Sequence, residues 1–493
     1  MLRGFAIVFG LVALFAVTVE LYLRSRTRSH WHSMEMLAEQ QLLAGGLQGL
    51  LRSRTMALSG AAAAADAEVA ATLALASAML ASDYGLDETQ AARSAADAIE
   101  AMPRASQRAQ SLKLASRALV EMTTGHPDRA EALARESVFL GHKQASPLFA
   151  LGRVRLRQGD LGAAAHAFQA ALVREPGFIE ARVAWAEVWF ERGEQVRARD
   201  GLLAAAQHTP DHSRMRLLLA ELDEGQPGST SPDWETTCAR DEGISPFIAG
   251  ACDLARALQA DRNHDRKAAI RLADSAGRHR PAEPRTLGRA AQLLASMGTV
   301  DRASTCLDEA LRIASPTLPS VRWAKLAVEL GRGYLPDLPQ DLPATSSPWA
   351  PLLKARIALA SGGIKALTAI LPELQNGNAE LDAFVQAAKS VANEALIDPD
   401  VLDPIKAYVY GMQARLAGKA ARAADLLSKA LQGHGDACRA AGEYLAVCRE
   451  LGRMPNANAF AWLVSENGRC VNLPANSDFD VASWTRSQKN KRH

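Results

Sequence analysis

The side chains that could do chemistry are few and scattered. His30 and His32 form an HxH pair, a spacing seen in zinc sites, but no cysteine or carboxylate lies nearby at ligand spacing. The segment 261–265, DRNHD, begins like a calcium loop but lacks the glycine and the closing glutamate that such a loop needs. We therefore expect no catalytic residue, no cofactor-binding residue and no metal ligand, and we interpret DRNHD as a turn between two helices.

The six cysteines are dispersed without a CxxC pair, which argues against a zinc ribbon. They are Cys238, Cys252, Cys306, Cys438, Cys448 and Cys470. Cys438 and Cys448 fall on one expected helix with their side chains about 80° apart, so they cannot bridge each other. Two alternatives stay open for the others: a bridge between neighbouring helices, such as Cys448 to Cys470, or buried free thiols.

Charge and composition narrow the class of protein. The 56 Lys and Arg residues nearly balance the 54 Asp and Glu residues, for a formal net charge of +2. This balance gives no reason to expect nucleic acid as a partner, so other proteins are the better expectation. Long stretches rich in Ala, Leu, Arg and Glu favour an all-α fold.

Residues 4–23 predict a single transmembrane helix. The uncharged apolar run Phe5–Val19 extends with Leu21, Tyr22 and Leu23 to nearly the length that spans a bilayer. A cleaved signal peptide is the alternative, but no clean small-x-small cleavage site follows the apolar run. We expect this helix to bind the lipid bilayer as an inner-membrane anchor.

The orientation of this anchor depends on its flanks. Arg3 lies on one side of the apolar run, and Arg24, Arg26 and Arg28 lie on the other. The positive-inside rule then places the body of the chain in the cytoplasm. A short basic start followed by a large periplasmic body is the alternative.

An internal repeat organises the chain from Ser111 to His212, which superposes on itself at a shift of 34 residues. Glycines fall in register at Gly125, Gly159 and Gly193, which predicts three helical hairpins. Gly159 should end the first helix of its hairpin in a conformation that glycine adopts without strain.

The small residues of this repeat should let the paired helices approach closely. Gly152 and Ala164 face each other across one hairpin, where larger side chains would push the helices apart. Phe168 should fill the space toward the next hairpin, and Pro176 should stop the second helix. Each hairpin leaves an apolar face bare, so the hairpins must stack.

The best repeat resembles the tetratricopeptide consensus position by position. It contains Leu148, Leu151, Gly152, Gly159, Asp160, Ala164, Phe168, Ala171 and Pro176. The same frame recurs with Gly298, Gly411, Gly418 and Gly452, which makes about seven recognisable units. The resemblance implies an all-α, right-handed solenoid of helical hairpins, here with one N-terminal transmembrane helix.

The breaks in the repeat divide the chain. We expect a transmembrane anchor at 4–23, degenerate helices at 31–110, a tetratricopeptide block at 111–224, an irregular linker at 225–249, a second block at 250–330, a proline-rich linker at 331–350, a third block at 351–472 and a disordered tail at 473–493.

The resemblance also implies a binding face, because the first helix of each hairpin usually lines the concave surface of the solenoid. The matching positions are Phe149, Arg153, Leu156, Val183, Glu187 and Phe190. This mixed apolar and charged set suits an amphipathic helix or an extended peptide of another protein. The alternative is that these side chains only cover neighbouring helices.

Three functions follow from these expectations. The first is a membrane-anchored scaffold for an envelope or polysaccharide-related complex, as the resemblance to anchored tetratricopeptide proteins implies. The second is a periplasmic scaffold for polymer export or envelope assembly. The third is an enzyme whose site lies in the irregular block around 331–348.

Overall fold

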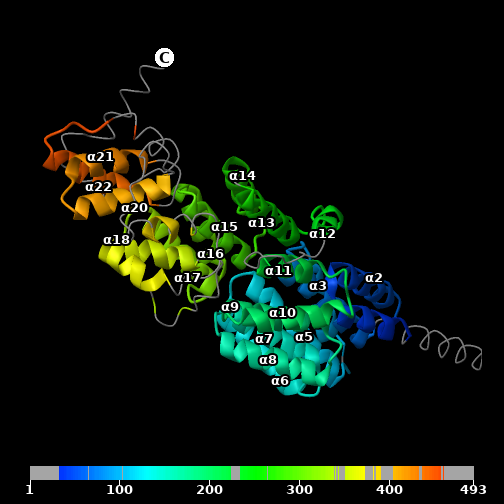
Figure 1. Cartoon of the computed structure of the whole chain (residues 1–493). Helices are drawn as coiled ribbons and strands as arrows, with labels where there is room; N and C mark the ends of the chain where they lie inside the picture. Colours follow the sequence, from blue (N-terminus) through cyan, green and yellow to red (C-terminus); the bar gives the residue numbers. More distant parts are fainter. Residues whose placement is uncertain are drawn as a thin grey trace, which may run out of the picture. The chain divides into compact units, whose positions relative to one another are not determined.

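In the computed structural model, the described residues form helices and no strand, which confirms the all-α prediction (Figure 1). The structure describes residues 33–64, 66–102, 104–223, 234–263, 265–337, 339, 342, 350–371, 381, 385–389, 404–431, 436–456 and 459. A first helix covers residues 33–44. It is followed by α2 (Gly46–Ala64), α3 (Ala67–Tyr84), α4 (Thr89–Glu100), α5 (Gln107–Thr123), α6 (Pro127–Leu140), α7 (Ala145–Arg157), α8 (Leu161–Arg174), α9 (Ile179–Glu191), α10 (Gln195–Ala206) and α11 (Ser213–Asp223). Then come α12 (Trp234–Asp241), α13 (Pro246–Arg262), α14 (Arg266–Ala276), α15 (Pro284–Ser296), α16 (Val300–Ile313), α17 (Pro319–Gly331), α18 (Ala350–Ile370), α20 (Pro404–Leu416), α21 (Ala420–Lys429) and α22 (Ala437–Glu450).

The chain divides into two compact units. Unit 1 comprises residues 1–155, 162–185 and 204–212, and unit 2 comprises 156–161, 186–203 and 213–493. The boundaries fall inside α7, α8, α9 and α10 and directly before α11, all within the expected tetratricopeptide block 111–224. Each unit is described separately below.

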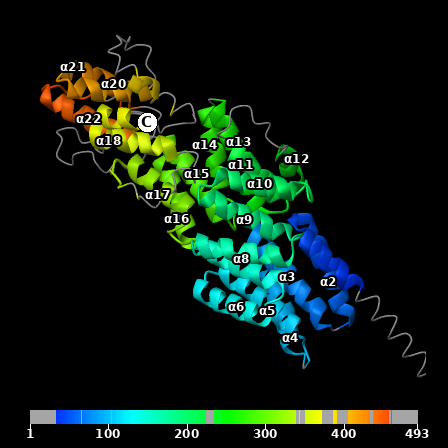
Figure 2. The same cartoon turned by 60° about the horizontal axis from the view of Figure 1, so that its bottom comes forward.

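Helix α3 lies at the centre of unit 1. It packs against α2, α4 and α5 (Figure 2), and every residue from Val69 to Tyr84 is buried. Its sequence is rich in alanine and leucine on all sides, as expected for a helix that is covered all round. Asp66 caps its first turn by accepting a hydrogen bond from the backbone N–H of Glu68, and Gly85 ends it at a φ of 68°.

The glycines of the repeat adopt the predicted turn conformation. Gly125, Gly159 and Gly193 have φ values of 84°, 80° and 78°. Gly298 and Gly418, from the weaker copies of the frame, also have positive φ. Each of these residues follows the first helix of a hairpin, which confirms that the glycine register marks the helix ends.

The paired helices of unit 1 approach closely at Gly152, as predicted, but the side chain nearest to this glycine is that of Phe168 and not that of Ala164. The ring of the buried Phe168, on α8, lies directly against Gly152 of α7. In unit 2, Gly411 of α20 and Leu427 of α21 repeat this arrangement. The space that glycine leaves is therefore filled by a large apolar side chain of the partner helix.

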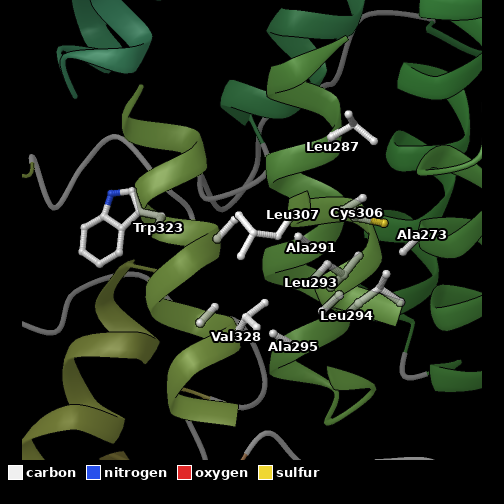
Figure 3. Close-up of a cluster of buried hydrophobic side chains, with 14 of the residues drawn as sticks. Ala273, Leu287, Ala291, Leu293, Leu294, Ala295, Cys306, Leu307, Trp323 and Val328 are labelled. Carbon is white, nitrogen blue, oxygen red and sulfur yellow. The ribbon is translucent and has the colours of Figure 1, made fainter. Parts of the chain in front are cut away.

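Unit 2 is built around stacked hairpins. Its largest described core draws side chains from α13 to α18, among them Ala273, Leu294 and Leu307, and Trp323 of α17 is fully buried (Figure 3). A second core joins α18 to α20, α21 and α22. The proline at the start of α15 and of α17 suits a first helical position, where its missing N–H costs nothing.

One segment differs from what the sequence led us to expect. The segment 225–249, expected to be irregular, contains α12, and α13 already begins at Pro246. In the segment 351–371, helix α18 is broken at Gly363, which has a φ of 65°, and this agrees with a helical segment that turns at its glycine pair. Asp265 caps α14 by accepting a hydrogen bond from the backbone N–H of Ala268, so DRNHD is a helix turn as predicted.

No helix in the described part of the chain combines the length and the apolar character needed to cross a bilayer. The expected anchor at 4–23, the HxH pair of His30 and His32, and the expected tail at 473–493 all lie outside the described residues. Half of the proline-rich segment 331–350 also lies outside them.

Candidate protein-binding faces

The residues of the expected binding face are largely buried. Phe149, Arg153 and Val183 belong to unit 1, and Leu156, Glu187 and Phe190 belong to unit 2. All are buried except Leu156, which is partly exposed. Whether any of them contacts a partner stays a prediction, but the structure shows what each one contacts within the chain.

In unit 1, Arg153 binds a residue of the chain's own helix α3. Its Nη2 lies 2.6 Å from Oδ1 of Asp83, and both side chains are almost fully buried. At the last residue of α3, Tyr84 donates a hydrogen bond of 2.7 Å to Oε1 of Glu180 on α9. On α5, Ser116 donates one of 2.9 Å to the backbone oxygen of Ala74.

These three contacts place α3 across the first helices of the repeat hairpins. Because α5, α7 and α9 are those first helices, the face that the resemblance assigns to a partner is occupied in unit 1 by α3. Phe149 is buried and packs against two other rings: its ring centroid lies 5.9 Å from that of Phe168 and 5.1 Å from that of Phe178.

Glu180 joins the N-terminal helices to the repeat, and the sequence did not single it out. Besides Tyr84, its Oε1 accepts a hydrogen bond from the backbone N–H of Gly46 at 2.9 Å and lies 3.2 Å from Nε2 of His212. The turn before α2, at Gly45 and Gly46, has positive φ at both residues. This turn is therefore fixed on the repeat by a buried carboxylate.

In unit 2, the expected face carries a buried charge network. Glu187 forms an ion pair with Arg214, and Glu221 forms ion pairs with Arg285 and Arg289. The guanidinium carbon of Arg289 also lies 5.1 Å from the ring centroid of Phe190. Glu187 and Phe190 therefore contact charged groups of the chain itself.

Glu191, next to Phe190, receives a hydrogen bond of 2.9 Å from the backbone N–H of Ser320. Burial raises the pKa of its carboxyl group, although the nearby charges of Arg289 and Arg285 act in the opposite direction. A buried group with a raised pKa is a candidate for function, but ion-pair networks produce the same shift.

One cluster superficially suggests a hydrolytic site. Ser275 donates a hydrogen bond of 2.6 Å to Oδ2 of Asp253, and Nε2 of His279 lies 2.9 Å from the same oxygen. Burial raises the pKa of Asp253, but the hydrogen bonds from His279 and Ser275 outweigh this effect and lower it. Because serine and histidine both bind the aspartate, the histidine is not placed as a base for the serine.

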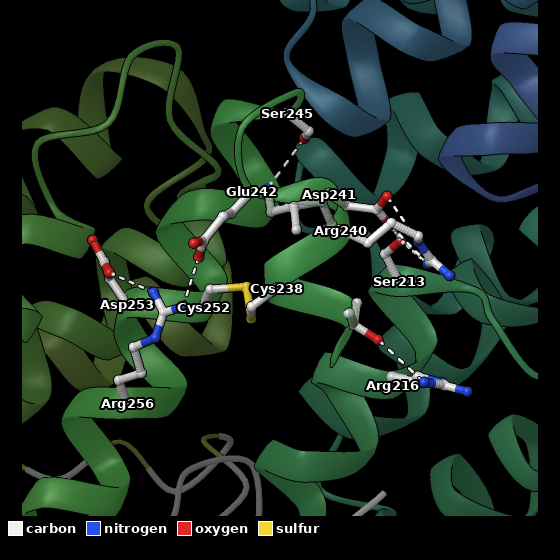
Figure 4. Close-up of a disulfide and its surroundings, with 12 residues drawn as sticks. Ser213, Arg216, Cys238, Arg240, Asp241, Glu242, Ser245, Cys252, Asp253 and Arg256 are labelled. Carbon is white, nitrogen blue, oxygen red and sulfur yellow. Dashed lines mark hydrogen bonds and ion pairs between the residues drawn. A yellow bond between two sulfur atoms is a disulfide. The ribbon is translucent and has the colours of Figure 1, made fainter. Parts of the chain in front are cut away.

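The cysteines settle two of the expectations. A disulfide joins Cys238 of α12 to Cys252 of α13 (Figure 4), and Cys438 is also disulfide-bonded. Cys448 is a free, buried thiol, so it forms no bridge to Cys438, as predicted, and the possible bridge to Cys470 is not made. Cys306 is free and buried as well.

Cys238, Cys252 and Glu242 bring potential metal-ligand atoms within 4.8 Å of one another. Both sulfur atoms belong to the disulfide, however, so they are not available as thiolates. Glu242 instead forms an ion pair with Arg256 at 2.7 Å (Figure 4). While the disulfide is intact, the carboxylate of Glu242 is the one group of this cluster that could bind a metal ion.

Residues 155–222, from the end of α7 to α11, match the family model of the tetratricopeptide repeat. This segment is therefore similar to tetratricopeptide repeats. Tetratricopeptide folds typically act as scaffolds that bind other proteins, and enzymatic activity is not typical of them. No curated protein sequence matches the chain.

Proposed function

We propose that the chain is a single-pass, membrane-anchored scaffold that assembles other proteins into an envelope or polysaccharide-related complex. The observation that carries the scaffold role is the tetratricopeptide match over 155–222, together with glycine turns of the same geometry at Gly298 and Gly418. Repeated hairpins of this kind stack into a right-handed solenoid with extended surfaces for partners. The apolar run within 4–23 supports the anchor and its contact with lipid.

The disulfides favour a periplasmic body over the cytoplasmic body that the arginine flanks suggest. Cys238 and Cys252 are fully buried and bonded to each other, and Cys438 is bonded as well. Disulfides form and persist in oxidising compartments and are rare in the cytosol of mesophiles. Three arginines on one side against one on the other is a small bias, and large domains are translocated largely regardless of charge.

A pair of fusions tests this orientation. A reporter active only in the periplasm and one active only in the cytoplasm are each fused to the C-terminal end of the full chain. We expect periplasmic activity, together with a Cys238–Cys252 crosslinked peptide when the chain is alkylated in intact cells before lysis. Cytoplasmic activity with free Cys238 would reject the periplasmic body and leave a scaffold on the inner face of the membrane.

The scaffold role itself is tested by photo-crosslinking the full chain in its membrane. Crosslinkers are placed at exposed residues of both units, such as Phe139 and Val196, which are 80% and 72% exposed. We expect specific adducts with a small set of proteins. If the chain forms no adduct from any exposed position, the scaffold role fails.

A further inference from the structure

Unit 2 contains a hollow of about 700 Å³ that is bordered by three turns of the chain. It is lined by Gly159, Leu161, Arg192, Glu194, Pro316, Thr317, Pro319 and Arg322. Gly159 precedes α8, and Leu161 is its first residue. Arg192 and Glu194 connect α9 to α10, and the other residues precede α17 or lie in its first turn. Segments more than a hundred residues apart in the sequence therefore form one site.

Hydrogen bonds hold these turns together. The backbone N–H of Ser315 donates to the carbonyl oxygen of Arg157, and the hydroxyl of Thr317 donates to that of Gln158, both at 3.2 Å. The buried carboxylate of Glu191 accepts from the backbone N–H of Ser320 at 2.9 Å. The hollow is thus fixed by the fold, so a ligand would not need to order it first.

The polar lining is predominantly basic. Two arginines, Arg192 and Arg322, line the hollow together with one acidic residue, Glu194. Arg192 is 4.6 Å from the ring centroid of Trp189 and 3.5 Å from Glu194, and its side chain remains 39% exposed. Stacking on the tryptophan orients this guanidinium while leaving part of it accessible to a ligand.

Apart from Gly159 and Thr317, the remaining lining is apolar, from Leu161, Pro316 and Pro319. Apolar walls with a few placed charged groups are typical of sites that bind an organic chain, and the volume is in the usual range of ligand sites. A free inorganic anion would make no use of those walls. Arginine pairs preferentially with carboxylates, often through two hydrogen bonds.

We propose that this hollow binds an acidic, partly apolar peptide segment of a partner protein, with its carboxylates on Arg192 and Arg322. This inference rests on the proposed scaffold function and names the class of partner segment. The site lies at the turns that join the paired helices, and not on the helix faces that the resemblance assigns to a partner. It therefore offers the repeat a second surface on which to bind another protein.

The proposal is tested by fluorescence anisotropy on the full chain in detergent. The probe is a fluorescein-labelled short peptide of glutamate, leucine and proline, and its counterpart carries lysine in place of glutamate. We expect the acidic probe alone to bind, and Arg192→Glu to weaken it by about tenfold, as loss of a charged hydrogen bond predicts. Arg192→Glu with Arg322→Glu should abolish binding.

Arg312→Glu is the matched control, because Arg312 is 69% exposed, lies outside the hollow and is ion-paired with Glu309 at 2.7 Å. If Arg312→Glu weakens the probe as much as Arg192→Glu, or if both probes bind equally, the hollow is not the site. Circular dichroism checks the fold of each variant. If the double variant misfolds, Arg192→Glu alone still tests the proposal, because the Arg192 side chain is partly exposed and its replacement should leave the fold intact.

Crosslinking separates failure of the hollow from failure of the scaffold role. If the full chain forms the same adducts with and without Arg192→Glu, and the acidic probe does not bind, the scaffold stands and the hollow is rejected. If the chain forms no adduct with any protein but binds the acidic probe through Arg192, the site stands and the scaffold role is rejected.

Discussion

The ring of Phe168 lies so close to Gly152 that a β-carbon at residue 152 would be 2.5 Å from ring atom Cε1. The ring is fully buried and also packs against Phe149, which leaves it little room to move. The spacing between α7 and α8 thus depends on the missing side chain of one glycine.

Gly152→Ala should therefore destabilise unit 1. Overpacking of a tight core costs about 1–3 kcal/mol, which exceeds the gain of about 1 kcal/mol from replacing glycine by alanine in a helix. The measurement is urea unfolding followed by circular dichroism. In a Phe168→Ala background, the methyl group that Gly152→Ala adds should not lower the free energy of unfolding, because the cavity left by the phenyl ring accommodates it. Equal losses in the two backgrounds would show that the ring does not control the approach of the helices.

The register of these glycines was predictable from the sequence because positive φ and close helix approach each restrict the residue type at one position. Gly152, Gly159 and Gly193 could be placed for this reason without any knowledge of distant contacts. The same reasoning predicted that DRNHD is a turn.

The partner of Arg153 could not be predicted in this way. A repeat period shows which positions are equivalent, but it does not show whether a helix from elsewhere in the chain covers them. Asp83 lies outside the repeat frame, in an alanine-rich segment whose composition predicts a helix and says nothing of its neighbours. Buried pairs between segments so far apart leave no signal in the local sequence. The disulfide between Cys238 and Cys252 was missed for a related reason, because the segment that contains α12 was expected to be an irregular linker.

Asp83→Ala should loosen α3 strongly. Removing one partner of a buried ion pair leaves the other charge uncompensated, which costs about 3–5 kcal/mol. We expect faster amide hydrogen exchange throughout α3, measured by mass spectrometry. The control is Glu131→Ala, which removes the partner of Arg135 at 2.6 Å in an exposed pair and should cost less than about 1 kcal/mol. Similar exchange in both variants would mean that Asp83 does not hold α3 in place.

Replacing Cys238 and Cys252 together by serine should destabilise the α12–α13 region. The two cysteines are 14 residues apart, and closing a loop of that length stabilises a fold by about 3 kcal/mol in the chain-entropy model. Thermal unfolding with and without a thiol reductant measures this effect. Wild type should lose stability when reduced after partial unfolding, whereas the double variant should not respond.

The control for this experiment is Cys306→Ala, which removes a free buried thiol. Burial raises the pKa of Cys306 to about 12, so this thiol is protonated and unreactive at neutral pH. Cys306→Ala should thus keep the wild-type response to reductant. A wild-type chain that is insensitive to reductant even when unfolded would show that the Cys238–Cys252 bond does not form.

Glu191 should make the stability of unit 2 depend on pH. Its pKa in the fold lies above the ordinary value of 4.5, mainly because burial disfavours the charged form. The folded state therefore binds a proton that the unfolded state has already released. Its contribution to stability is complete below about pH 4.5 and is lost as the pH rises through the folded pKa.

Glu191→Gln removes this titration while keeping an oxygen that can accept the hydrogen bond from Ser320. The stability of this variant relative to wild type should accordingly increase as the pH rises from about 4.5. Urea unfolding midpoints across this range, followed by tryptophan fluorescence, give the measurement.

Glu309→Gln provides a control of opposite sign. A hydrogen bond from Arg312 lowers the pKa of Glu309, so its contribution is present above about pH 4.5 and is lost as the pH falls through the folded pKa. Relative to wild type, Glu309→Gln should lose stability as the pH rises, while Glu191→Gln gains it. Because the two carboxyl groups belong to the same unit, a general effect of pH on the fold would shift both variants in one direction. Opposite slopes would therefore assign the dependence to the two side chains, and parallel slopes would contradict the raised pKa of Glu191.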